Sequence, residues 1–236
     1  MDYAASGLTG PRLLLEGSRG YFHTVAERFE PKEVVSLGRW HLAAPRRKQH
    51  ACCGYIHAAL DLIAGLRARL GAAQLATAAI TVRMPAHIIP AVVKALPPAT
   101  PNEARFHTQY CAAVAAAEAD VILPAHSNEM RHYLDRADIH RLMAAIQVEA
   151  DESLRHYEEC RIGLVLADGS VESVSTRSAK GSPTNPLAPA EMRRKFLLLT
   201  ADMLPRERAE AYADAVLNLE RYPELDWLFS DVATAR

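Results

Sequence analysis

The sequence has few cysteines, no long apolar run and no excess of charge of either sign. Four cysteines in 236 residues, two of them adjacent, are too few for a disulfide framework, so we expect reduced thiols in a cytoplasm. No stretch reaches the roughly 18 uninterrupted apolar residues of a membrane span, and the N-terminus lacks the basic start of a secretion signal. The 27 basic and 28 acidic residues nearly cancel, so no whole-protein field would attract nucleic acid or an anionic membrane.

Phosphate-binding loops and the common hydrolase motifs are also missing. The chain contains no GxGxxG, Walker loop, HExxH or GxSxG pattern, so nucleotide binding and those hydrolase chemistries have no support. What the chain does have is a globular composition, 50% hydrophobic and 23% charged, rich in alanine and leucine. Such a composition supports a sizeable core built mostly from helices.

Apolar periodicity predicts helices mixed with a few strands. Helical spacing marks four segments: 56–70, 106–117, 192–203 and 209–219. Strand-like alternation marks four others: 77–84, 146–150, 161–167 and 171–176. Asp168-Gly169 lies between the last two and suits a tight turn with positive φ, so these two strands are expected to form a hairpin.

These elements divide the chain into three regions. Residues 1–45, interrupted by glycines, hold short helices and loops without a complete core. Residues 46–180 combine helices and strands, and 181–236 open with a glycine- and proline-containing loop that leads into two helices. We therefore predict a mainly α protein with an α+β lid domain at 46–180, in which helices cover a small mixed sheet. The segments 1–45 and 181–236 are expected to form a partial helical body.

The densest group of reactive side chains lies in 46–57, directly before an amphipathic helix. One interpretation is a metal pair formed by Cys53 and His57 with help from Cys52, although this spacing is generic. A second is an anion site, in which Lys48, His57 and the N–H groups of the helix N-terminus bind a carboxylate or phosphate. The third is an ordinary helix start with small buried thiols.

A second group of chemically capable side chains lies in 105–111. Tyr110 falls on the apolar stripe of its helix, where an aromatic ring commonly belongs to the core. A phenol at a pocket wall can also donate a proton or hydrogen-bond an intermediate. Spacing alone leaves both interpretations of Tyr110 open.

Four stretches, taken in order, carry a family resemblance. They are Leu8-Thr9-Gly10-Pro11 with Leu15–Gly20; Lys48 through Cys53-Gly54-Tyr55-Ile56-His57 with Asp61; Phe106–Tyr110; and Asp168-Gly169 followed by Lys180–Leu187, Glu191 and Lys195-Phe196. Each motif is weak by itself, but their order and spacing resemble the MmgE/PrpD family. This family includes 2-methylcitrate dehydratases, cis-aconitate decarboxylases and iminodisuccinate epimerases.

The resemblance implies a large helical body and an α+β lid, usually in a homodimer, with a small di- or tricarboxylic acid bound between the domains. It implies lyase or isomerase chemistry without cofactor or metal, in which a proton moves next to a carboxylate. Carried over by position, Lys48 pairs with a substrate carboxylate or stabilises developing negative charge. Tyr110 donates a proton or a hydrogen bond, and His57 is a nearby catalytic candidate. Cys53, at a position where some members place a histidine, and Gln109 are implied substrate contacts.

The resemblance begins about halfway along a family member. The first half of the helical body, with its aspartate and histidine motifs and a further lysine, has no counterpart in these 236 residues. We therefore expect either a 2-methylcitrate dehydratase-like subunit, which forms a homodimer or pairs with a partner chain that supplies the missing half, or a non-catalytic remnant. In both cases the C-terminal helices are expected to carry an apolar face that another chain or a rearrangement covers.

Overall fold

The computed structural model describes residues 5–30, 32 and 45–228, and its contacts divide the chain into two units, Met1–Pro45 and Arg46–Arg236. The first unit contains the short helix α2 (Tyr21–Val25), whose Phe22 ring lies 4.9 Å from that of Phe29. Parts of the predicted N-terminal and C-terminal regions, 33–44 and 229–236, lie outside the described residues. The candidate site lies in the second unit.

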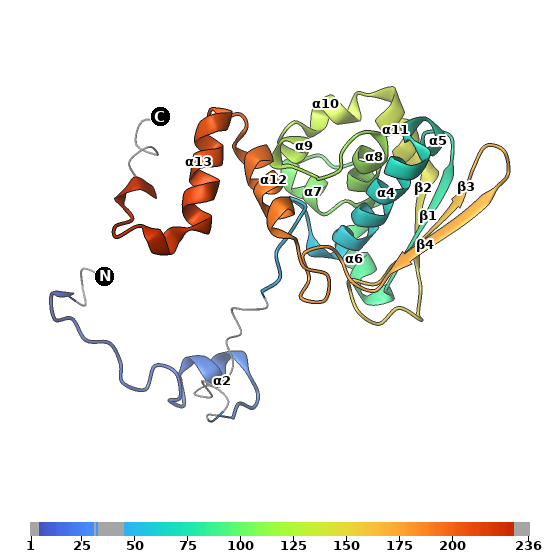
Figure 1. Cartoon of the computed structure of the whole chain (residues 1–236). Coiled ribbons are helices and arrows are strands. Elements are labelled where there is room, and N and C mark those ends of the chain that lie inside the picture. Colours follow the sequence, from blue (N-terminus) through green and yellow to red (C-terminus); the bar gives the residue numbers. More distant parts are fainter. Residues whose placement is uncertain (1–4, 31, 33–44, 229–236) are drawn as a thin grey trace. The chain divides into compact units, whose positions relative to one another are not determined.

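The second unit contains a four-stranded sheet with the strand order β2-β1-β3-β4 (Figure 1). Its strands are β1 (Ala79–Met84), β2 (Ile146–Ala150), β3 (Cys160–Val165) and β4 (Val171–Thr176). β1 pairs parallel with β2 and antiparallel with β3, and β3 pairs antiparallel with β4. The turn of the β3–β4 hairpin contains Gly169 at φ +83°. The predicted strands and hairpin are confirmed.

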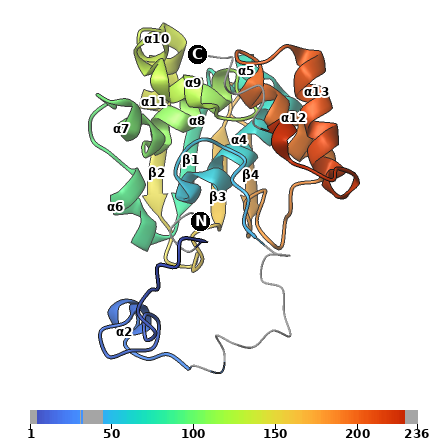
Figure 2. The ribbon, with the colours of Figure 1, turned by 90° about the vertical axis from the view of Figure 1, so that its left-hand side faces the viewer.

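Three longer helices cover one face of this sheet: α4 (His57–Leu70), α8 (Thr108–Ala117) and α11 (Ala137–Ala145). Figures 1 and 2 show α4 and α8 on the same side of the sheet, and both helices contact strands. Ile80 and Val82 of β1 are buried under them, whereas Arg83 points to the exposed face and pairs with Glu149 at 3.1 Å. Because alternate side chains leave a strand on opposite faces, this pattern matches the predicted alternation. The predicted fold, mainly helical with a small mixed sheet, is confirmed.

Short helices connect these layers. They are η2 (Gly54–Ile56), α5 (Ala72–Leu75), η3 (Ala86–Ile88), α6 (Ile89–Val92), α7 (Pro101–Arg105), α9 (Pro124–Asn128) and α10 (Met130–Leu134). Two histidines satisfy backbone N–H groups at helix starts: Nδ1 of His107 accepts from Tyr110 N at 3.3 Å, and Nδ1 of His126 accepts from Leu123 N at 2.8 Å. A ring nitrogen can accept in this way only while it is unprotonated.

The two predicted C-terminal helices are present as α12 (Pro189–Thr200) and α13 (Arg206–Leu217), followed by η4 (Leu219–Arg221) and η5 (Asp226–Leu228). Asp120 connects α12 to α4, because it pairs with both Arg194 of α12 and Arg67 of α4. The apolar side chains of α12, α13 and their flanks are largely exposed: Met192, Leu198, Leu199, Met203, Val216 and Leu217. What covers this face stays a prediction. None of the helices in the described ranges has both the length and the apolar character needed to span a membrane.

Candidate functional site

Residues 46–53, which carry much of the predicted site, are tied to three other parts of the fold. Their backbone N–H groups donate at 2.7–2.8 Å to carbonyl groups far away in sequence: Arg47 to Gly181, Ala51 to Ile122 and Cys53 to Arg105. Each bond fixes a different point of the segment, so the side chains between these points project from a constrained backbone. These bonds hold residues 46–53 as a constrained loop ahead of α4, which we call the pinned loop.

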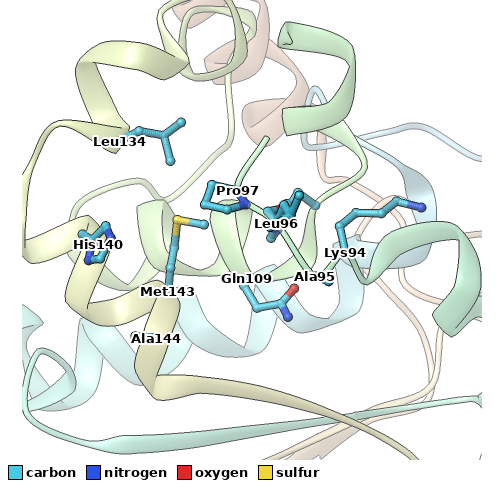
Figure 3. Close-up of a pocket in the computed structure, with 10 residues that line it drawn as sticks. Lys94, Ala95, Leu96, Pro97, Gln109, Leu134, His140, Met143 and Ala144 are labelled. Atoms are coloured by element: carbon cyan, nitrogen blue, oxygen red, sulfur yellow. The ribbon is translucent and has the colours of Figure 1, made fainter. Parts of the chain in front are cut away.

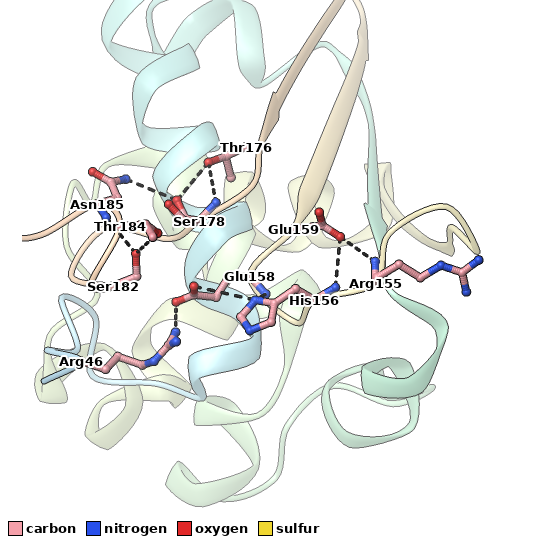
Figure 4. A network of polar contacts seen from close by, with 10 residues as sticks. All are labelled: Arg46, Arg155, His156, Glu158, Glu159, Thr176, Ser178, Ser182, Thr184 and Asn185. Atoms are coloured by element: carbon pink, nitrogen blue, oxygen red, sulfur yellow. Dashed lines mark hydrogen bonds and ion pairs between the residues drawn. The ribbon is translucent and has the colours of Figure 1, made fainter. Parts of the chain in front are cut away.

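The loop at 178–185 contains Gly181, whose carbonyl accepts from the Arg47 N–H. Gly181 has φ +90°, and a Cβ at this position would collide with the carbonyl oxygen of Arg47, so only glycine fits. Side chains close the loop on itself: Ser182 Oγ accepts from Asn185 N at 3.1 Å, and Asn185 Nδ2 donates to Ser178 O at 3.3 Å (Figure 4). The glycine, serine and asparagine of this loop therefore hold the lysine-bearing segment in place.

Asp61 on α4 hydrogen-bonds both the pinned loop and the loop at 178–185. Its Oδ1 lies 3.1 Å from His50 Nε2, and its Oδ2 accepts from the Lys180 backbone N–H at 2.7 Å. His50 Nδ1 accepts from the Ile122 N–H at 3.1 Å, so in the neutral ring Nε2 must carry the proton and donate it to Asp61. Both nitrogens of this buried ring are thus committed.

Lys48 lies at the centre of the pinned loop, and its Nζ donates to the Cys52 carbonyl at 3.2 Å. The same carbonyl accepts from Nε2 of His57, the first residue of α4, at 3.4 Å. Lys195 of α12 donates through its Nζ to the Lys48 carbonyl, and burial, together with the charge of Lys48, lowers the pKa of Lys195. Two ammonium groups therefore lie near one another at the junction of the loop and α12.

Two cavities share Lys48 and Cys53 as lining residues. The first, which we call the Tyr157 cavity, has a volume of about 300 Å³ and is lined by Arg46, Arg47, Lys48, Cys53, Gly54, Tyr55, His57, Tyr157, Glu158, Ala179 and Lys180. Arg46 pairs with the buried Glu158 (Figure 4) and lies 4.9 Å above the Tyr157 ring, so its charge is compensated within the protein.

The second cavity, which we call the Arg105 cavity, has a volume of about 470 Å³. Its lining residues are Lys48, Ala51, Cys52, Cys53, Asn102, Arg105, Phe106 and Pro124. It contains two cations and no acidic side chain. Burial raises the pKa of the Cys53 thiol, so Cys53 is neutral near pH 7 and adds no negative charge. This cavity therefore favours an anionic ligand.

The structure brings three of the predicted site residues together and separates two others from them. Lys48, Cys53 and His57 line the Tyr157 cavity. Gln109 lines a different cavity of about 310 Å³, formed with residues of α10, α11 and the chain after α6, such as Leu96 and Met143 (Figure 3). A role for Gln109 in contacting the same substrate stays a prediction.

Tyr110 lies in the core. Its side chain is 1% exposed, and its hydroxyl donates to the His126 carbonyl at 2.5 Å. Burial raises the pKa of this phenol above its usual range. The hydroxyl is thus used within the protein in this conformation, and Tyr110 lines neither cavity at Lys48. Its catalytic role stays a prediction.

Arg105, Asn102 and Tyr157 line these two cavities, although the sequence did not single them out as site residues. Arg105 belongs to the polar cluster at 105–111, which gave a signal, but nothing in the sequence placed it beside Lys48. The metal interpretation gains no support, because no three histidine, cysteine or acidic residues within the described ranges are grouped to hold a metal ion.

No curated protein gives a significant sequence match to the chain. The family model described as the MmgE/PrpD C-terminal domain matches residues 50–221. This range contains Cys53, His57, Arg105 and Tyr110, the whole sheet with its covering helices, and α12 and α13. This match covers well over half of the sequence, and the chain therefore belongs to the MmgE/PrpD family.

Proposed function

We propose that this chain supplies the lid wall of a site for a small di- or tricarboxylic acid, at which a proton moves next to a carboxylate without a cofactor. The reaction is of the lyase or isomerase type, similar to that of a 2-methylcitrate dehydratase. The observation that carries the proposal is the pinned loop, which holds the Lys48 ammonium between two cavities. A fixed cation is suited to a substrate carboxylate and to the negative charge that develops on a carboxylate-stabilised carbanion.

His57 is the candidate proton carrier. Its Nε2 donates to the Cys52 carbonyl, so in the neutral ring Nδ1 holds the lone pair that can accept a proton. Cys53 contributes a neutral, half-buried thiol to the wall. Tyr110 acts as a donor in this proposal only after its hydroxyl leaves the His126 carbonyl, and Gln109 contacts substrate only if the ligand extends into its separate cavity.

The opposite wall of the site comes from a partner chain in this proposal. The exposed apolar side chains of α12 and α13 support such an assembly. All four cysteines are free thiols, which fits the reducing environment of a cytoplasm, and we propose that location.

Solvent deuterium exchange tests the proposal. 2-Methylcitrate and cis-aconitate are incubated with the purified chain in D2O, with and without a candidate partner chain, and both proton exchange and product formation are followed by NMR. Lys48→Met is expected to reduce the rate by about 100-fold or more, whereas Lys32→Met, which changes an exposed lysine of the first unit, serves as the matched control. Absence of exchange and turnover for both acids in both settings would contradict the proposal.

The alternative is a non-catalytic remnant or a partner-dependent subunit, and the burial of Tyr110 favours it. In this case the phenol stabilises the core through the His126 carbonyl and has no chemical role. For a remnant, the wild type and the Tyr110→Phe and Lys48→Met variants would all show no exchange and no turnover, with or without a partner chain. For a partner-dependent subunit, the wild type would show activity only after the partner chain is added. A loss of activity in Lys48→Met at unchanged stability excludes the remnant.

A further inference from the structure

Lys48 and Arg105 line one cavity although neither has an acidic partner. Among the described residues, no carboxylate lies within ion-pair distance of either side chain, whereas nine other arginines form such pairs: Arg46, Arg67, Arg69, Arg83, Arg136, Arg161, Arg193, Arg194 and Arg206. Arg105 is also half-buried. Lys48 is exposed, so both cations can reach a ligand from solvent, and two unpaired positive charges that line one cavity attract an anion into it.

Neutral groups fix the position of both cations. The Arg105 Nη2 donates to Asn128 Oδ1 at 2.9 Å, which orients the guanidinium without neutralising it. The Arg105 carbonyl accepts from the Cys53 N–H at 2.8 Å, and Lys48 Nζ donates to the Cys52 carbonyl at 3.2 Å. The backbone that carries Arg105 is thus bonded directly to the loop that carries Lys48. Such prior positioning lowers the cost of binding a ligand between the two charges.

The other walls of the Arg105 cavity define the ligand further. Phe106 is 39% exposed and provides an apolar surface, and Asn102 provides an amide that can bond a hydroxyl or a carboxylate oxygen. The volume of about 470 Å³ lies within the range of small-ligand pockets. A guanidinium binds a carboxylate with two parallel hydrogen bonds, which an ammonium cannot do.

We propose that Arg105 is a substrate-binding residue, which holds one carboxylate of a polycarboxylic acid while Lys48 faces a second carboxylate or the reacting centre. This inference rests on the proposed function and extends it, because it assigns specificity for at least two acid groups to a residue outside the predicted site. A monocarboxylic acid would use only one of the two cations and would bind more weakly.

Direct binding of an unreactive probe tests this assignment separately from catalysis. Tricarballylate, a tricarboxylic acid, and butyrate, a monocarboxylic acid, are titrated into the full chain by calorimetry at low salt. Tricarballylate is expected to bind at least about 10-fold more tightly than butyrate. Arg105→Gln is expected to weaken tricarballylate binding by roughly 10- to 100-fold, and Arg105→Lys by less. Arg141→Gln, which changes an exposed arginine of α11, is the matched control.

Asn128→Ala removes the orienting partner while leaving the charge in place, and it is expected to weaken tricarballylate binding by only a few fold. Unchanged binding in Arg105→Gln, or no binding of tricarballylate to the wild type at millimolar concentration, would overturn the assignment. The proposed function would survive the first result if Lys48→Met still abolished deuterium exchange. Conversely, a loss of binding in Arg105→Gln with no exchange in the wild type would support the acid-binding site and refute the proposed chemistry.

Discussion

The link from Asp61 to His50 and Lys180 leads to a prediction about a single-atom substitution. Asp61→Asn keeps the size of the side chain but turns one oxygen acceptor into an NH2 donor. His50 must donate through Nε2, because its Nδ1 accepts from Ile122, and the Lys180 backbone N–H also needs an acceptor. An asparagine can accept from only one of them, so in either orientation of its amide two donors face each other.

The cost follows from the burial of the groups involved. The His50 ring is 1% exposed and the Asp61 side chain 19% exposed, so water cannot fully replace the lost acceptor. Leaving one buried donor unsatisfied costs about 1–3 kcal/mol, and weakening the bond to a charged acceptor adds to this. We expect Asp61→Asn to lower the free energy of unfolding by about 2–4 kcal/mol, which corresponds to a Tm lower by about 5–10 °C in a unit of this size.

Urea denaturation, thermal unfolding and amide hydrogen exchange provide the measurements. The amides of Ile122 and Lys180 are expected to lose more protection than amides of the β1–β3 pairing. Asp202→Asn, at an exposed position between α12 and α13, is the control and is expected to change stability by less than about 0.5 kcal/mol. The reasoning is refuted if Asp61→Asn is as stable as this control, or if the loss of protection is uniform across the unit.

Three further changes test the supports of the site. Gly181→Ala is expected to destabilise the chain by more than about 2 kcal/mol in urea denaturation, because its Cβ would meet the Arg47 carbonyl at a positive φ; equal stability would contradict this close approach. Tyr110→Phe removes the donor to the His126 carbonyl and is expected to cost about 1 kcal/mol in the same measurement. Burial lowers the pKa of His107 and of His126, so their neutral forms stabilise the fold above about pH 6.5. Urea denaturation between pH 8 and pH 5 should therefore show the free energy of unfolding falling as the pH drops below about 6.5. A free energy of unfolding that does not change with pH would contradict the proposed role of these two neutral rings as acceptors at helix starts.

The predicted helices and strands followed from local patterns in the sequence, whereas α11 and the short helices between β1 and β2 were not predicted. The three- and four-residue spacing at 56–70 became α4, and the alternation before Pro85 became β1. Asp168-Gly169 indicated the hairpin because a positive φ at Gly169 is a local requirement of the turn. The sequence did not predict the order in which the strands pair. The parallel contact between β1 and β2 joins segments more than 60 residues apart, and no local pattern specifies it.

The candidate site was likewise predictable in part from the sequence and in part only from the tertiary structure. The sequence by itself determined which residue types were available: a lysine, two thiols and two histidines in 46–57, and a tyrosine on an apolar helical stripe. Only the tertiary structure decided their neighbours, because hydrogen bonds from this loop to Gly181, Ile122 and Arg105 depend on chain segments that meet only after folding. It buried the Tyr110 hydroxyl against His126, and it set Arg105 and Lys48 around one cavity that contains no acid.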